Sequence, residues 1–242
     1  MDAGASNRPN KAHFPANTVL FDLDGTLIDH FSAIHRAVAY AQKKLGLPES
    51  SYRKVRETVG GSVPITLSKL CGGSEAAAEA EPYFREHFHA IMYEDVAILP
   101  GAQSLLQALS EQGFTLAVLT NKVDPHAKSI LAHLGLDGYL QAILGTGDAQ
   151  PYRKPDPRFT MQALEILDRS SDDCILVGDS PYDFATAEAA CLPCHLVATG
   201  SHSIEQLQAE TNAAGIYPDL HEFAKKYFHL TLPENQPKAK GA

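Results

Sequence analysis

Short apolar runs alternate with longer amphipathic stretches along most of the chain, and the two patterns predict different elements. The first run, residues 19–22, is rich in β-branched and aromatic side chains, as is typical of a buried strand. Later runs have the same character, and the stretches between them show helical spacing with Gly or Pro near their ends. The later strands are predicted over residues 114–119, 142–144, 174–177 and 195–197, with an edge strand at 215–217, and the helices over residues 103–112, 124–134, 156–167, 185–190 and 219–227.

Residues 30–96 have a different character, because no strand pattern occurs among them. Apolar residues recur at helical spacing over residues 30–45, and Gly46 and Pro48 end that helix. Further helices are predicted over residues 50–58, 63–70 and 75–93. An all-helical insertion therefore follows the first strand directly.

Repeated strand–helix units imply a parallel sheet with helices on both faces, and right-handed crossovers make it Rossmann-like. The expected fold class is α/β, with this sheet and an inserted all-helical domain. We expect a Rossmann-like core formed by residues 18–29 and 97–232 and a helical domain formed by residues 30–96. The segments 1–17 and 233–242 lack apolar patterning and are expected to be disordered tails.

Composition narrows the class of protein. With 242 residues, 44% of them hydrophobic, the chain can bury an ample core. A net charge of −9 disfavours binding to nucleic acid or anionic membranes, and no apolar run reaches the roughly 18 residues of a membrane span. The four cysteines, including Cys191 and Cys194, lack the partners of a zinc site and are expected to be reduced thiols in a cytoplasmic protein, monomeric or homodimeric.

Two carboxylates follow the first strand at once, in the sequence Asp22-Leu23-Asp24-Gly25-Thr26. Residues two apart in a strand point to the same face, so both carboxylates approach one point beyond its carboxyl end, where open α/β sheets bind ligands. Converging anionic oxygens repel each other unless a cation lies between them, and oxygen ligands favour Mg²⁺. Gly25 allows the sharp turn that follows.

This five-residue stretch resembles the first motif of the haloacid dehalogenase superfamily in its phosphatase form, DxDGT. The resemblance implies that Asp22 is a nucleophile that forms an aspartyl-phosphate and that Asp24 is the general acid/base. The dehalogenases of the superfamily lack the second Asp, so Asp24 favours phosphoryl transfer.

Three later strand ends resemble the remaining motifs of the superfamily, in the same order. The resemblance implies that Thr120 binds the phosphoryl oxygens, that Asn121 helps to position the substrate, and that Lys154, in the KPxP sequence, neutralises the nucleophile and the transferred group. The sequence GDSxxD implies that Asp179 binds Mg²⁺ and that Asp183 supports the ion from the second shell, often through water. Each motif alone has a plainer interpretation as a helix cap or a turn.

The resemblance extends to the helical insertion, which matches the cap that closes over the active site in the superfamily. Caps set the substrate, and the best candidates for contact with it are Arg56, Gly60 and Gly61, although a helix–helix turn with solvated basic residues explains them equally well. The histidines suggest no competing site: His87 and His89 face different directions on a helix, and His126 lacks partners.

The function implied is that of a Mg²⁺-dependent phosphomonoesterase acting on a small phosphorylated metabolite, most similar to the phosphoglycolate phosphatases. Metal ligands would be Asp22, Asp24 through its backbone carbonyl, and Asp179. A β-phosphoglucomutase-like phosphotransferase, a pyrophosphatase or a nucleotidase of the same superfamily remains an alternative. A catalytically silent binding protein is a further alternative, which the intact motif residues disfavour.

Overall fold

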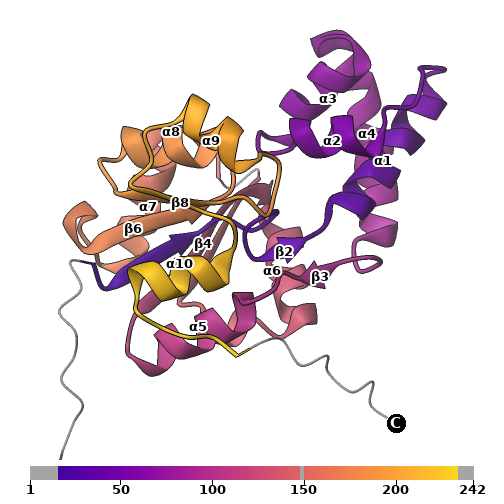
Figure 1. Cartoon of the computed structure of the whole chain (residues 1–242). Coiled ribbons are helices and arrows are strands. Elements are labelled where there is room, and N and C mark those ends of the chain that lie inside the picture. Colours follow the sequence, from indigo (N-terminus) through magenta and orange to yellow (C-terminus); the bar gives the residue numbers. More distant parts are fainter. Residues whose placement is uncertain (1–15, 148–149, 234–242) are drawn as a thin grey trace, which may run out of the picture.

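The computed structural model describes residues 16–147 and 150–233, and most of the two predicted tails lies outside these ranges. The described residues form a parallel six-stranded sheet in the order β5-β4-β1-β6-β7-β8 (Figure 1). This order confirms the predicted Rossmann-like α/β fold, with β1 central. The strands are β1 (Thr18–Phe21), β4 (Thr115–Val123), β5 (Ala142–Thr146), β6 (Cys174–Gly178), β7 (Cys194–Val197) and β8 (Gly215–Tyr217).

Helices cover both faces of the sheet, because successive strand residues point to opposite sides. Val19 and Phe21 of β1 pack in the same apolar cluster as α5 (Ala102–Glu111), α6 (Asp124–Leu134) and α10 (Leu220–Tyr227). Leu20 packs on the other side with α7 (Pro157–Leu167), α8 (Pro181–Ala189) and α9 (Ile204–Glu210). Burial on both faces explains why the central strand is apolar throughout rather than alternating.

Four helices lie to one side of the sheet and pack mainly on one another (Figure 1). They are α1 (Phe31–Lys44), α2 (Tyr52–Thr58), α3 (Val63–Cys71) and α4 (Ser74–Ile91). The longest, α4, packs on α1 and α3 through buried residues such as Ala80 and Phe84. The predicted helices of residues 30–96 are thus all present, and the same region holds no strand in this structure.

Short elements account for most differences from the prediction. The chain enters and leaves the four helices through β2 (Ile28–Asp29) and β3 (Ala97–Ile98), which pair antiparallel. Strands of two residues carry no periodicity, so the sequence did not predict them. The helix α9 (7 residues) is also absent from the prediction, although Ser203 and Gln206 form a capping box at its start. The helix predicted from residue 185 begins one turn earlier, at Pro181, because Ser180 and Asp183 form a capping box.

Residues 16 and 17, which fall in the predicted N-terminal tail, contact the core. Ala16 is buried, and the backbone of Asn17 donates to the Asp173 carbonyl and accepts from the Thr115 N–H. In the ranges 16–147 and 150–233, no helix has both the length and the apolar character that crossing a bilayer requires. Cys194 is buried in the cluster around α7 and α8, whereas Cys191 is exposed and does not pack in the core.

Candidate active site

Polar side chains from three strand ends and one loop converge at the carboxyl edge of the sheet. Asp22 follows β1, Thr120 lies in the last part of β4, and Asp179 follows β6. Lys154 comes from the loop between β5 and α7. Three of these side chains are almost completely buried, and Asp22 is only 6% exposed. The side chains that the sequence predicts at the strand ends therefore do lie at one place in the structure.

Lys154 lies between two carboxylates at the centre of the site. Its Nζ donates to Asp22 Oδ1 at 2.6 Å and to Asp183 Oδ1 at 2.7 Å. Burial alone would lower the pKa of Lys154, but the carboxylates of Asp183 and Asp22 raise it above its usual range, so the ammonium stays charged. Burial raises the pKa of Asp22 to about 6, against the opposing charge of Lys154.

Asp179 is held by the loop after β7. Its Oδ2 accepts from the backbone N–H of Ser201 at 2.8 Å and from the Ser201 hydroxyl at 3.0 Å. Burial, together with the neighbouring carboxylates of Asp183 and Asp22, raises the pKa of Asp179 well above its ordinary value. The cluster thus holds more negative charge than Lys154 alone can neutralise.

The three carboxylates Asp22, Asp179 and Asp183 offer oxygens within 4.8 Å of one another, a spacing that fits a metal ion. Both carboxylate oxygens of Asp183 already accept hydrogen bonds. Oδ1 accepts from Lys154 Nζ, and Oδ2 accepts from the backbone N–H groups of Asp179 and Ser180 and from the Ser180 hydroxyl. Within the described ranges, no hydrogen bond reaches Asp22 Oδ2 or Asp179 Oδ1. An all-oxygen site of this kind suits a hard divalent cation, with Asp183 as a supporting residue.

Gly200 is a residue of this site that the sequence did not reveal. A Cβ at this position would overlap the Asp179 carboxylate, so the loop approaches Asp179 only because residue 200 has no side chain. We expect Gly200→Ala to weaken the binding of a divalent cation at this site about 10–100-fold, the usual effect of disturbing a residue that orients a metal ligand.

Magnesium titrations that follow thermal stability and activity would measure this change. Gly138→Ala is the control, because an added Cβ there meets no atom within 4 Å. Unchanged affinity in Gly200→Ala would show that Asp179 does not hold the ion.

Asp24 is paired with a lysine that was not predicted to take part. Lys122 Nζ donates to both Asp24 oxygens, at 3.0 and 2.9 Å, and lies 4.9 Å from the centre of the Phe88 ring. His30 Nδ1 lies 3.7 Å from Asp24 Oδ1, and burial lowers the pKa of His30 to about 4, so this imidazole is neutral near pH 7. Gly25 makes the predicted turn after Asp24, with φ of 90°.

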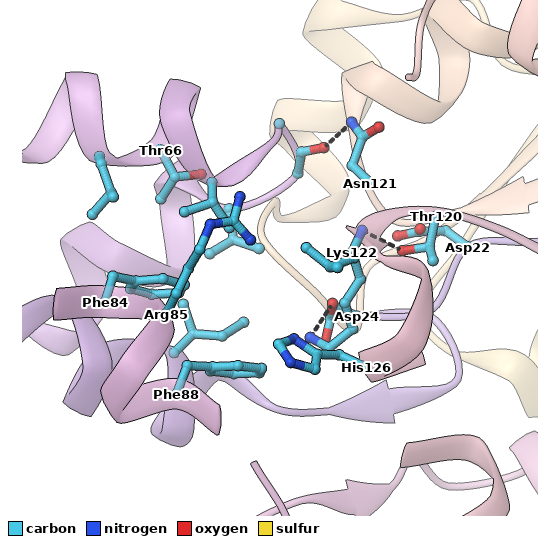
Figure 2. Close-up of a pocket in the computed structure, with 17 residues that line it drawn as sticks. Asp22, Asp24, Thr66, Phe84, Arg85, Phe88, Thr120, Asn121, Lys122 and His126 are labelled. Atoms are coloured by element: carbon cyan, nitrogen blue, oxygen red, sulfur yellow. Dashed lines mark hydrogen bonds and ion pairs between the residues drawn. The ribbon is translucent and has the colours of Figure 1, made fainter. Parts of the chain in front are cut away.

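Asn121 joins two separate loops. Its Nδ2 donates to the Gly60 carbonyl at 3.1 Å, the contact drawn in Figure 2, and its Oδ1 accepts from the Lys154 N–H at 2.9 Å. Through these bonds the Asn121 side chain positions both the Lys154 loop and the turn after α2. Thr120 is nearly free of such bonds, since its Oγ1 accepts only from the Lys122 N–H at 3.2 Å among the described residues.

Arg56 lies apart from the pocket. Its guanidinium donates to the carbonyls of Gly200 at 2.9 Å and Thr199 at 3.0 Å, and it lies over the Phe31 ring. Arg56 therefore links α2 to the loop that holds Asp179. Gly60 and Gly61, the other two residues predicted from the helical domain, do line the pocket.

The pocket extends from Asp22 and Asp24 toward the inner face of the four helices (Figure 2). Its walls beyond the carboxylates are mostly apolar, with Arg85 and Thr66 as polar exceptions on the helices and His126 on α6. The His126 ring packs beside those of Phe88 and His89, with 5.6 Å between the ring centres in each case. The apolar residues of the wall are Ile34, Val59, Val63, Leu67, Phe84, Phe88 and Val123.

Comparisons with known proteins point the same way. The family model of the haloacid dehalogenase-like hydrolases matches residues 19–197. A phosphoglycolate phosphatase of Cereibacter sphaeroides is 34% identical over 72% of this chain and 81% of its own, and one of Pseudomonas fluorescens is 31% identical over 92% of this chain and 85% of its own. A solved structure described as "a predicted phosphatase from Clostridium acetobutylicum" superposes with a TM-score of 0.82 at 32% identity, over 89% of this chain and 99% of that chain.

Proposed function

The chain belongs to the haloacid dehalogenase-like hydrolases, and on that premise we propose that it is a Mg²⁺-dependent phosphomonoesterase that works through an aspartyl-phosphate. The observation that best supports this proposal is the position of the Lys154 ammonium, which is hydrogen-bonded to both Asp22 and Asp183. Beside it lie carboxylate oxygens of Asp22 and Asp179 that accept no hydrogen bond from the described residues. The names of the relatives support a small phosphorylated metabolite, with 2-phosphoglycolate as the first candidate.

In the first half-reaction, a carboxylate oxygen of Asp22 attacks the phosphorus. A new O–P bond forms as the bond from phosphorus to the leaving oxygen breaks. Lys154 fixes Oδ1 of the nucleophile and places a positive charge where the phosphoryl oxygens gather. Asp22, the Asp24 backbone carbonyl and Asp179 would hold Mg²⁺, which would supply further charge neutralisation for the dianionic ester. Thr120 Oγ1 donates to a phosphoryl oxygen.

Asp24 carries the proton in both half-reactions. It protonates the leaving oxygen, then takes a proton from the water that hydrolyses the aspartyl-phosphate. Both Asp24 oxygens accept from Lys122 in this structure, so one of these side chains must rotate before Asp24 reaches the leaving oxygen.

Residues 30–96 act in this proposal as a cap on a core made of residues 18–29 and 97–232. Polar contacts support the arrangement, because they join the helices to the core around the pocket. Arg153 Nη1 donates to Ser62 Oγ at 2.8 Å and Lys69 Nζ to the Tyr182 hydroxyl at 3.4 Å, besides the bonds from Arg56 and Asn121.

A screen of phosphorylated metabolites with Mg²⁺, recording phosphate release by the wild-type protein and by Asp22→Asn, tests the proposal. We expect release from one small phosphoacid and none with the variant. Sugar-phosphate isomerisation with little phosphate release would instead identify a mutase. No turnover of any ester, aryl phosphates included, would refute the enzymatic proposal.

We further expect Mg²⁺ to stabilise the protein more at pH 7.5 than at pH 5. The pKa of Asp22 is raised to about 6, so the metal-free folded state binds more protons than the unfolded chain and loses stability as the pH rises from about 4 to 6. Metal ions need ionised carboxylates, so protons compete with them at pH 5. With Mg²⁺ at a hundred times its dissociation constant at pH 7.5, the gain should be about 2.7 kcal/mol.

Thermal unfolding with and without Mg²⁺ at both pH values measures the effect. In Asp179→Asn the increment at pH 7.5 should vanish. An increment that is equal at both pH values, or that survives in the variant, would assign the binding to acidic groups elsewhere on the chain.

A further inference from the structure

The far end of the pocket holds a charge that the proposed mechanism does not use. Arg85, on α4, lies across the pocket from Asp22 and Thr120 (Figure 2). Arg85 is the only basic residue of α1–α4, as the structure describes them, that lines the pocket. The wall around it is formed largely by Phe84, Phe88 and other apolar side chains, while the Arg85 side chain itself is 41% exposed.

The guanidinium of Arg85 is held in place on one side only. Its Nε donates to Glu81 Oε1 at 2.7 Å, and its Nη2 donates to the same oxygen. Within the described residues, no hydrogen bond engages Nη1. Glu81 does not line the pocket, so it holds the Arg85 guanidinium from the side away from the cavity. The remaining N–H donors of the guanidinium can therefore face the cavity.

The other charges of the pocket are already balanced. Lys122 pairs with Asp24, and Lys154 pairs with Asp22. Burial is the main cause that lowers the pKa of His126, and the charges of Lys122, His89 and Arg85 lower it further. Arg85 is paired as well, with Glu81, but its Nη1 makes no hydrogen bond among the described residues and can donate to an anionic partner.

We infer that Arg85 is a specificity residue that binds an anionic group, a carboxylate, on the leaving group of the substrate. The inference rests on the proposed phosphatase function, because it assumes that the phosphoryl group is bound at Asp22. The preferred substrates are then phosphate esters of short hydroxy acids. A guanidinium suits a carboxylate because its planar fork donates two parallel hydrogen bonds.

Kinetics with a matched pair of esters test the inference. In 2-phosphoglycolate the leaving group ends in a carboxylate, and in 2-hydroxyethyl phosphate a neutral hydroxyl takes its place. We expect Arg85→Gln to raise KM for 2-phosphoglycolate about 10–100-fold, the usual value of a charged hydrogen bond, with kcat and both constants for 2-hydroxyethyl phosphate changed less than about threefold. Arg85→Lys, which keeps the charge but loses the fork, should give an intermediate KM.

Arg53→Gln is the matched control. Arg53 also pairs with a glutamate one helical turn away, Glu57, but lies on the exposed side of α2 away from the pocket. An equal loss with both esters in Arg85→Gln, or no loss with either, would overturn the assignment. If the wild-type protein hydrolyses 2-hydroxyethyl phosphate as well as 2-phosphoglycolate, the assignment fails while the phosphatase proposal stands. Release from neither ester, nor from any other phosphomonoester, would overturn both.

Discussion

Replacing Asp22 by Asn is expected to lower kcat by at least about 10⁴-fold, because the amide cannot act as the nucleophile. The protein should remain folded. Burial raises the pKa of Asp22 to about 6, so ionised Asp22 costs stability in the metal-free protein at pH 7.5, and a neutral amide of the same shape removes that cost. Lys154 retains Asp183 as its partner. Activity and metal-free stability are therefore expected to separate in this variant.

Rapid acid quenching during turnover, followed by mass spectrometry, gives a second measurement. The wild-type protein should carry one phosphoryl group, and Asp22→Asn should carry none. Asp172→Asn, at an exposed position, is the control for the substitution itself. A phosphoenzyme in the variant, or activity within tenfold of the wild type, would contradict the assignment of Asp22.

Lys154→Met should have the largest effect on stability. The change leaves two buried carboxylates, Asp22 and Asp183, without their shared cation, and removing one partner of a buried ion pair costs about 3–5 kcal/mol. Activity should fall as well, since no positive charge then orients the nucleophile. Without Lys154 the pKa of Asp22 rises further above its unfolded value, so the loss of stability should be greater at pH 7.5 than at pH 5.

Denaturant unfolding of the metal-free protein at both pH values measures this loss. Lys128→Met is the control, because Lys128 also pairs with an aspartate, Asp124, but is 55% exposed, and exposed pairs contribute about 0–1 kcal/mol. Equal stability of the Lys154 and Lys128 variants would show that the central ammonium does not hold the site together.

The fold and the centre of the site could be predicted because their signals are local. Each buried strand is an apolar run, and the polar residue that follows it must lie at the carboxyl edge of a parallel sheet. Asp22, Thr120 and Asp179 meet for that reason. The two-residue strands β2 and β3 lack a period long enough to detect.

Other features depend on how distant elements are oriented, which no local pattern records. Lys122 meets Asp24 across 98 positions of sequence. Arg56 and Arg85 both lie on helices of the same domain, yet one contacts the Asp179 loop and the other faces the pocket. The sequence predicted Arg56 as a substrate contact because it precedes a glycine turn, and it gave no means of ranking Arg85 above it. Gly200 is likewise important only because Asp179 approaches it.

The β2–β3 ribbon joins the helical domain to the sheet at two adjacent points. Ile28 pairs with Ile98 and Asp29 with Ala97, and paired residues of antiparallel strands lie about 4.5–5.5 Å apart at their Cα atoms. Insertions whose ends are this close disturb the host fold little. Evolution can therefore replace or enlarge the segment between residues 30 and 96 while the chain path through Asp22, Lys154 and Asp179 stays the same. A chimaera that carries a foreign helical segment between these two strands should accordingly keep the chemistry and exchange the preferred ester.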